Sequence, residues 1–217
     1  MNNHSLSRRH LLALVSMTTL LAACGKKSTP TARAIAAGST VLALGDSLTS
    51  GVGTDATTAY PAVLHELTGW QVINGGVSGE TSAQALVRTP ALLKEHNPEL
   101  VILSIGGNDF LRQMSAASTK ENIRSICEAA TASGAQALLV AVPQFSLLAA
   151  STGRLTDHPL YAELADELKL PLHQNGWAEV LADASLRSDQ IHANAQGYRR
   201  FTEGLTGQLR ASGLLAG

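Results

Sequence analysis

Short apolar runs alternate with stretches of helical period from Ser39 to the end of the chain. Continuous apolar runs predict buried strands, and apolar residues three or four positions apart predict helices that pack over them. This alternation is typical of a parallel sheet with crossover helices, so we expect an α/β domain, a three-layer α/β/α sandwich. The predicted strands cover residues 40–44, 70–73, 100–105, 137–142 and 170–172, and the predicted helices cover 60–67, 81–96, 119–132, 159–168 and 195–212.

Two prolines and an asparagine refine the predicted helices. Pro61 is tolerated in the first turn of its helix. Pro90 is expected to break or restart the helix at 81–96, because proline lacks the N–H that a helix interior uses. Asn194 is expected to cap the last helix.

Glycine-rich polar segments follow the first three predicted strands. They are residues 45–47, 74–76 and 106–109. In open parallel sheets, ligand sites form at the carboxyl ends of the strands. We therefore expect the functional site at this edge of the sheet.

The first 23 residues have the layout of a secretory signal peptide. Arg8 and Arg9 precede an apolar run over residues 11–23, and the segment has no acidic residue. The run is shorter than the roughly 20 residues of a membrane-spanning helix, and such an anchor is the alternative interpretation. The paired arginines fit a twin-arginine signal as well as an ordinary Sec signal, so the export route stays open.

This leader ends in Leu-Ala-Ala at Cys24, which resembles a bacterial lipobox. In such proteins the cysteine is lipidated and becomes the N-terminus, and several acyl chains hold the protein at a membrane. We expect a signal peptide at 1–23, a lipidated N-terminus and flexible tether at 24–38, and one folded domain at 39–217. The domain is expected to face the periplasm or the cell surface.

Composition and charge indicate one folded domain and argue against some classes of partner. The chain has 217 residues, of which 45% are hydrophobic and 15% charged, enough to bury one substantial core. Removal of the leader leaves 14 basic and 17 acidic residues, a net charge of −3, with no basic stripe, which argues against nucleic acid as a partner. The histidines show no ligand spacing, so no metal site is expected. A monomer is the expected state.

A hydroxyl and an imidazole at opposite ends of the domain are the first candidates for chemistry. Ser47 lies where the first strand turns toward a helix, and its backbone N–H can face an oxyanion. Asp189 precedes His192 by three residues, so its carboxylate can orient the ring. Asn108 and Gly79 can offer further hydrogen bonds to an oxyanion. Taken singly, Gly-Asp-Ser is common turn chemistry, and an Asp-His pair is commonly solvated.

Other residues are expected to have structural roles. Asp46 and Asp109 are expected to brace their turns by accepting hydrogen bonds from backbone N–H groups, with direct catalysis as the alternative. Cys127 is expected to be a small buried residue. Residues 145–155 form either an apolar flap over the site or buried loop packing.

Four segments together resemble the four blocks of the SGNH (GDSL-type) hydrolase family, in the same order and spread over nearly the whole domain. They are residues 45–48, Gly79, residues 106–109 and the Asp189/His192 pair. The resemblance implies a flavodoxin-like fold. It implies that Ser47 is the nucleophile, that His192 is the general base and later acid, and that Asp189 orients the imidazole. It further implies an oxyanion hole made of the Ser47 N–H, the Gly79 N–H and the Asn108 side-chain amide.

The resemblance is nearest to small bacterial members with thioesterase and lysophospholipase activity. Residues 60–64, 74–81 and 194–198 look like that branch, whereas Ala193 stands where proline is usual. This departure affects the loop and removes no catalytic group. The implied activity is hydrolysis of aryl, short acyl or lysophospholipid esters, with thioesters as further substrates, through an acyl-enzyme without a cofactor.

Two alternatives remain open. The same triad would serve a polysaccharide O-acetyl esterase, and the same fold would serve a non-catalytic binding lipoprotein of the envelope. The presence of every catalytic position disfavours the second. Location bears on the substrate, because acyl-CoA is cytoplasmic, and an enzyme tethered in the envelope would meet lysolipids or other acyl esters.

Overall fold

The structure is a computed structural model that describes residue 1, residues 32–144 and residues 155–216. The predicted signal peptide, Cys24 and most of the predicted tether lie outside the described residues, as does most of the candidate flap at 145–155. From residue 32 onward, the described residues belong to one unit.

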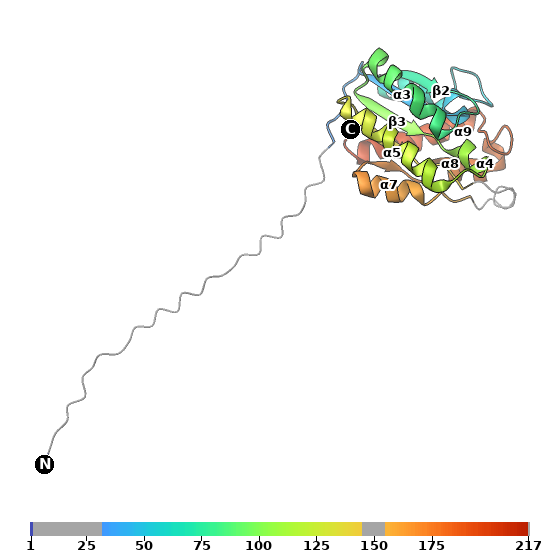
Figure 1. Cartoon of the computed structure of the whole chain (residues 1–217). Helices are drawn as coiled ribbons and strands as arrows, with labels where there is room; N and C mark the ends of the chain where they lie inside the picture. Colours follow the sequence, from blue (N-terminus) through green and yellow to red (C-terminus); the bar gives the residue numbers. More distant parts are fainter. Residues whose placement is uncertain (2–31, 145–154, 217) are drawn as a thin grey trace. The chain divides into compact units, whose positions relative to one another are not determined.

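In the described part of the chain, five parallel strands form one sheet in the order β2-β1-β3-β4-β5 (Figure 1). The strands are β1 Thr40–Gly45, β2 Gln71–Gly76, β3 Leu100–Ser104, β4 Gln136–Val140 and β5 Leu172–His173. This is the doubly wound order of flavodoxin-like sheets, in which the winding reverses between β1 and β3. The carboxyl ends of β1, β2 and β3 therefore lie side by side, and each carries a polar turn.

Helices cover both faces of the sheet. They are α1 Ser47–Ser50, α2 Tyr60–Thr68, α3 Ser82–His96, α4 Gly107–Leu111, α5 Ala116–Ala132, α7 Leu160–Leu168, α8 Gly176–Ala182 and α9 Ala195–Ala211, with a 3-10 turn, η1, at Ala184–Leu186. In Figure 1, α3, α5 and α7 lie in front of the sheet, with α8 and α9 behind it. Val41 and Ala43 pack with α2, α8 and α9, whereas Leu42 and Leu44 face α3, α5 and α7, because alternate strand residues point to opposite faces. The three-layer sandwich is confirmed.

Aromatic packing fixes α8 and α9 against the sheet. Trp177 of α8 stacks on Phe201 of α9, and its indole N–H donates a hydrogen bond to the Ser104 hydroxyl at 3.0 Å. This bond ties α8 to the carboxyl end of β3. The polar tip of a buried tryptophan is thereby satisfied.

The structure differs from the predicted elements in four helices. Helices α1, α4 and α8 were not predicted, because four, five and seven residues are too few to display a helical period. Helix α3 runs through Pro90 without interruption, so the predicted break is wrong. Pro90 lies on the exposed face of α3, while the helix start is fixed by a capping box at Thr81 and Gln84.

The domain begins earlier than predicted. Ile35 is buried, and its N–H donates to the Leu214 carbonyl at 2.8 Å. The backbone N–H of Arg33 donates to the Gln136 side chain, also at 2.8 Å. The packed part therefore extends back to Arg33, and the predicted tether at 24–38 is too long at its C-terminal end. A lone apolar residue among small and polar ones shows no period, so the sequence carried no signal of this contact.

His173, the last residue of β5, makes the stability of the domain depend on pH. It is buried, and its Nε2 atom has no hydrogen-bond partner among the described residues. Burial lowers its pKa from 6.5 to about 4, because an imidazolium would lose its hydration. Between pH 6.5 and pH 4, His173 is protonated in the unfolded chain but neutral in the folded chain. The contribution of neutral His173 to stability is therefore complete above pH 6.5 and is lost as the pH falls toward 4.

We expect His173→Leu to remove this dependence. Between pH 7 and pH 5, the free energy of unfolding of the variant should fall by about 2 kcal/mol less than that of the wild type. Urea titrations at the two pH values measure the difference. Burial raises the pKa values of Asp46 and Asp157, so these two carboxyls favour the folded state as the pH falls, opposite to His173. Both are present in the variant and in the wild type, so their effect cancels in the comparison. Equal losses in variant and wild type would contradict the prediction.

Candidate active site

Ser47 is the first residue of α1, directly after β1. Asp46 caps this short helix, since its Oδ1 atom accepts a hydrogen bond from the Leu48 N–H at 3.1 Å. Gly45 allows the turn, because a Cβ at this position would lie 2.2 Å from the Ser104 carbonyl oxygen. Gly-Asp-Ser therefore sets the serine at the carboxyl edge of the sheet.

Asp189 and His192 lie in the loop before α9. Asp189 Oδ1 accepts hydrogen bonds from the N–H groups of Ile191 at 2.8 Å and His192 at 2.9 Å. The other carboxylate oxygen, Oδ2, lies 2.8 Å from His192 Nδ1. One carboxylate thus holds both the loop and the imidazole ring. Asn194 caps α9 as predicted, by accepting a hydrogen bond from the Gly197 N–H at 3.0 Å.

The fold brings the two ends of the domain together at this point. His192 Nε2 lies 3.0 Å from Ser47 Oγ, although 145 positions separate the residues. Carboxylate, imidazole and hydroxyl form one hydrogen-bonded chain, the arrangement of a serine hydrolase triad.

The charge of Asp189 suits this arrangement. Partial burial acts to raise its pKa, but hydrogen bonds from His192 and Ile191 outweigh burial and hold the pKa below its usual value. The carboxylate is therefore ionised at neutral pH. A charged acceptor at Nδ1 keeps a proton there and leaves Nε2 free to accept the serine proton.

Asn108 and Gly79 lie in the segments that follow β3 and β2, the two strands on either side of β1. Asn108, in α4, donates from Nδ2 to the Glu80 carbonyl at 3.0 Å and approaches Asp46 Oδ2 at 3.4 Å. Gly79 has a φ of +79°, in the left-handed region that favours glycine. Asn108 and Ser47 line the same pocket, whereas Gly79 is not among its lining residues. Glu80 joins the two loops through its carbonyl.

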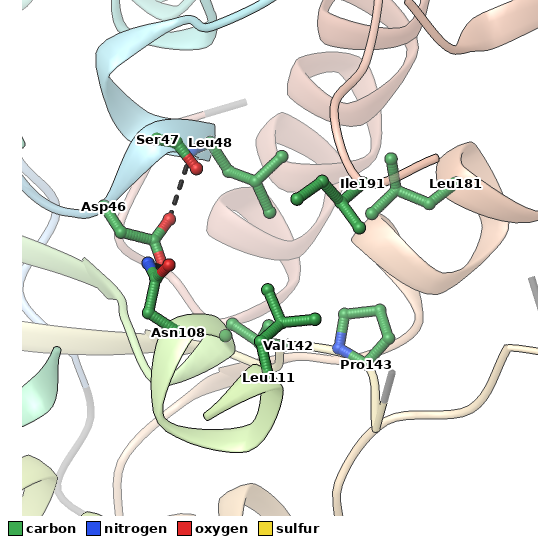
Figure 2. Close-up of a pocket in the computed structure, with 10 residues that line it drawn as sticks. Asp46, Ser47, Leu48, Asn108, Leu111, Val142, Pro143, Leu181 and Ile191 are labelled. Carbon is green, nitrogen blue, oxygen red and sulfur yellow. Dashed lines mark hydrogen bonds between the residues drawn. The ribbon is translucent and has the colours of Figure 1, made fainter. Parts of the chain in front are cut away.

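A largely apolar pocket lies beside Ser47, and its space, including the part open to solvent, amounts to about 430 Å³. Figure 2 shows the polar side chains of Asp46, Ser47 and Asn108 on one side of it, with apolar side chains around the rest. The apolar lining residues are Leu48, Leu111, Val142, Pro143, Leu181 and Ile191. Such a pocket can hold an apolar group whose polar end lies at the serine.

The predicted turn-bracing role is confirmed for Asp46, whereas Asp109 accepts its backbone hydrogen bond from Ser82 and so joins α4 to the start of α3. Asp109 is fully buried and accepts hydrogen bonds from the N–H and hydroxyl of Ser82 at 2.8 and 2.5 Å. Asp46 braces α1 as described above, and burial raises its pKa to about 7 against the hydrogen bond from Leu48, which lowers it. Asp46 therefore titrates near neutrality within contact of the site.

No metal site is found in the ranges 32–144 and 155–216, where no three His, Cys, Asp or Glu side chains are grouped to hold an ion. None of the helices in those ranges has the length and apolar character to cross a bilayer. The buried position of Cys127 is confirmed.

The sequence patterns did not predict the residues that support and line the site. Arg88 and Glu80 form a largely buried ion pair behind the site, and Val142, Pro143 and Leu181 complete the pocket. An arginine eight residues after a glutamate would lie two turns away along a helix, too far for contact, and the pocket residues come from segments far apart in the chain. Neither set has a local signal.

Comparison with known proteins agrees with this geometry. Residues 43–200 match the GDSL-like lipase/acylhydrolase family. The chain is 36% identical over 183 residues to thioesterase 1/protease 1/lysophospholipase L1 of Escherichia coli K12, covering 81% of this chain and 85% of that protein. It is 39% identical over 112 residues to esterase TesA of Pseudomonas aeruginosa, covering 49% of this chain and 56% of that protein.

Solved structures also resemble this chain. The crystal structure of TesA superposes with a TM-score of 0.70 at 30% identity, over 80% of this chain and 99% of that one. The crystal structure of AlinE4, an SGNH-hydrolase family esterase, has a TM-score of 0.60 at 27% identity, over 82% of this chain and 98% of that one. The sheet has flavodoxin order, polar residues lie at its carboxyl edge, and the family match covers most of the chain. The chain therefore belongs to the GDSL-like lipase/acylhydrolase family and is an SGNH esterase.

Proposed function

We propose that the chain hydrolyses carboxylic esters through an acyl-enzyme on Ser47, with His192 as base and acid and Asp189 as the orienting carboxylate. The observation that carries this proposal is the 3.0 Å distance between His192 Nε2 and Ser47 Oγ at the edge of an apolar pocket. One chain supplies all of these groups, so the proposed active form is a monomer.

In the first half of the reaction, His192 Nε2 takes the Ser47 proton while Oγ attacks the carbonyl carbon of the ester. The carbonyl oxygen becomes an oxyanion. Its proposed donors are the N–H of Ser47, the N–H of Gly79 and the amide of Asn108. The bond to the alcohol oxygen then breaks, that oxygen takes the proton from His192, and the acyl group remains on Ser47.

Water completes the reaction. A water molecule gives a proton to His192 Nε2 as its oxygen attacks the acyl carbon. The bond to Ser47 Oγ breaks, and the serine regains the proton from His192. The products are an alcohol and a carboxylic acid, and the same groups serve both halves.

The acyl chain is the part of the substrate that the pocket fits, because the lining beyond Ser47 is apolar. Leu111 lies at the exposed rim. We expect Leu111→Trp to lower kcat/KM for p-nitrophenyl octanoate about tenfold, with less than a twofold change for the acetate, because indole bulk obstructs longer chains. A series of p-nitrophenyl esters of increasing length measures this, with Ser47→Ala as the blank.

Val87 provides the matched control for this series. It is highly exposed on α3 and is not a pocket residue, so Val87→Trp adds the same side chain elsewhere. The ratio of octanoate to acetate turnover should stay at the wild-type value in this variant. An equal drop for both esters in Leu111→Trp would place the acyl chain outside this pocket.

Lysophospholipids are the proposed natural substrate class. An apolar pocket beside the proposed nucleophile fits a fatty acyl chain, and one relative is named a lysophospholipase and thioesterase. An enzyme exported from the cytoplasm is separated from acyl-CoA but meets lipid fragments. Turnover of lysophosphatidylcholine far below that of p-nitrophenyl acetate would count against this choice.

We also propose export and lipid anchoring at Cys24, as the leader pattern suggests. In a bacterial host, Cys24→Ser should move the protein from the membrane fraction to the soluble fraction and abolish labelling by a palmitate analogue. Cys127→Ser serves as the control, because Cys127 lies in the core and its replacement should keep the label. A labelled Cys24→Ser protein would contradict anchoring at this residue.

A further inference from the structure

Arg88 reaches from α3 to the edge of the sheet at which the site lies. Its Nη2 atom donates to the Gly75 carbonyl at 2.6 Å and to the Gly45 carbonyl at 3.2 Å. Its Nε and Nη2 atoms donate to the two carboxylate oxygens of Glu80 at 2.7 and 2.5 Å. One guanidinium therefore joins the ends of β1 and β2 to the loop that follows β2.

This contact is set away from solvent. The Arg88 side chain is 23% exposed and that of Glu80 is 6% exposed. A two-pronged guanidinium–carboxylate contact fixes direction as well as distance. The groups that Arg88 contacts therefore have little freedom to move. Removal of one partner from such a buried pair would leave the other charge uncompensated.

Each proposed oxyanion donor is near in sequence, or hydrogen-bonded, to a residue that Arg88 contacts. Ser47 follows Gly45 by two residues, and Gly79 directly precedes Glu80. The Glu80 carbonyl accepts the hydrogen bond from Asn108 Nδ2 at 3.0 Å. The three donors come from α1, the loop after β2 and α4, and the contacts of the Arg88–Glu80 pair connect these three segments.

We propose that Arg88, through Glu80, is a positioning residue for ester hydrolysis that sets the spacing of the oxyanion donors without touching the substrate. The inference rests on the proposed roles of Ser47, Gly79 and Asn108. Oxyanion donors act only within about 2.7–3.1 Å of the developing charge. A displacement of about 1 Å can cost roughly a hundredfold in rate.

A purely structural role would have a different signature. It would lower the stability of the domain but leave turnover per folded molecule unchanged. A positioning role lowers kcat and leaves KM near its wild-type value, because the oxyanion exists only in the transition state and the intermediate. The two roles are therefore separated by kinetics measured on folded protein.

Arg88→Lys is the first variant to measure. Lysine keeps the charge but lacks the planar fork, so it cannot hold two carbonyls and both carboxylate oxygens at once. We expect kcat for p-nitrophenyl butyrate to fall about 10-fold to 100-fold, with KM changed less than threefold, in protein shown to be folded by near-UV circular dichroism.

Arg124→Lys is the matched control. Arg124 of α5 has a similar side-chain exposure of 24% and forms ion pairs with Glu121 and with Glu167 of α7. These contacts join two helices on one face of the sheet and involve no pocket residue. The control should keep the wild-type kcat. An equal kcat in the folded Arg88→Lys and Arg124→Lys proteins would overturn the proposal.

A double-mutant cycle with Asn108→Ala gives the second readout. If Arg88 acts through the oxyanion hole, Arg88→Lys should cost about threefold or less once the Asn108 amide is gone, because interacting residues are not additive. Full additivity would overturn the proposal. If Arg88→Lys does not fold, Glu80→Gln, which weakens the same contact from the other side, takes its place in both tests with the same expected results.

Ser47→Ala separates the failure of this inference from the failure of the proposed mechanism. An active Ser47→Ala protein would remove the mechanism and the inference together. An inactive Ser47→Ala protein beside an Arg88→Lys protein of wild-type kcat would leave the triad proposal intact and overturn the positioning role alone.

Discussion

Ser47→Ala is expected to lower kcat for p-nitrophenyl esters by about a millionfold. The variant has no hydroxyl to form the acyl-enzyme, and what remains is binding and hydrogen bonding to the oxyanion. Initial rates with p-nitrophenyl butyrate measure the loss. Labelling with a fluorophosphonate probe, which needs the activated serine, should disappear as well.

Ser50 supplies the control for this variant. It lies at the end of the same short helix, and its hydroxyl donates to the Ser47 carbonyl at 3.2 Å. Ser50→Ala should keep activity within a fewfold of the wild type. Because Ser47 and His192 act as a unit, the double variant Ser47→Ala/His192→Ala should be no slower than Ser47→Ala alone. A Ser47→Ala protein within tenfold of wild-type kcat would refute the nucleophile assignment.

Asp189→Asn is expected to lower kcat by about a thousandfold to ten-thousandfold. The asparagine oxygen can still accept the two hydrogen bonds from Ile191 and His192 that fold the loop. Its amide would then donate to His192 Nδ1, which forces the ring proton onto Nε2 and removes the acceptor for Ser47. The loss therefore reports the imidazole contact and not collapse of the loop. Steady-state kinetics from pH 5 to pH 9 measure it.

Asp183→Asn is the matched control for this change. Asp183 accepts a hydrogen bond from the Ser185 N–H at 2.8 Å, in the same kind of turn, and caps η1. It is not a pocket residue, so the control should retain wild-type kcat. Similar activity in the Asp189→Asn and Asp183→Asn proteins would show that the carboxylate does not orient His192.

The central strands of the sheet were predictable because they are buried on both faces. β1, β3 and β4 consist almost entirely of buried apolar residues, and a continuous apolar run is the direct result of that environment. β2 and β5 lie at the edges of the sheet. β2 is partly exposed and β5 has two residues, so the apolar pattern placed their bounds less well.

The α/β class and the polar turns at the strand ends could be predicted from the amino-acid sequence, because burial periodicity and turn chemistry are local properties of a few neighbouring residues. The order of the four blocks along the chain also pointed to Ser47, Asn108, Asp189 and His192. The 3.0 Å distance between Ser47 Oγ and His192 Nε2, across 145 positions, could not be predicted in this way, since it depends on how the fold places α1 against the loop before α9.

The pocket and the Arg88–Glu80 contact likewise arise from tertiary packing. The pocket is lined by residues from α1, α4, α8, the segment after β4 and the loop before α9, and no local pattern connects them. The partners of Arg88 lie on the ends of two strands and on a loop, which are near each other only in the folded sheet. Contacts between distant segments depend on the whole fold, so a periodicity read along the chain contains no information about them.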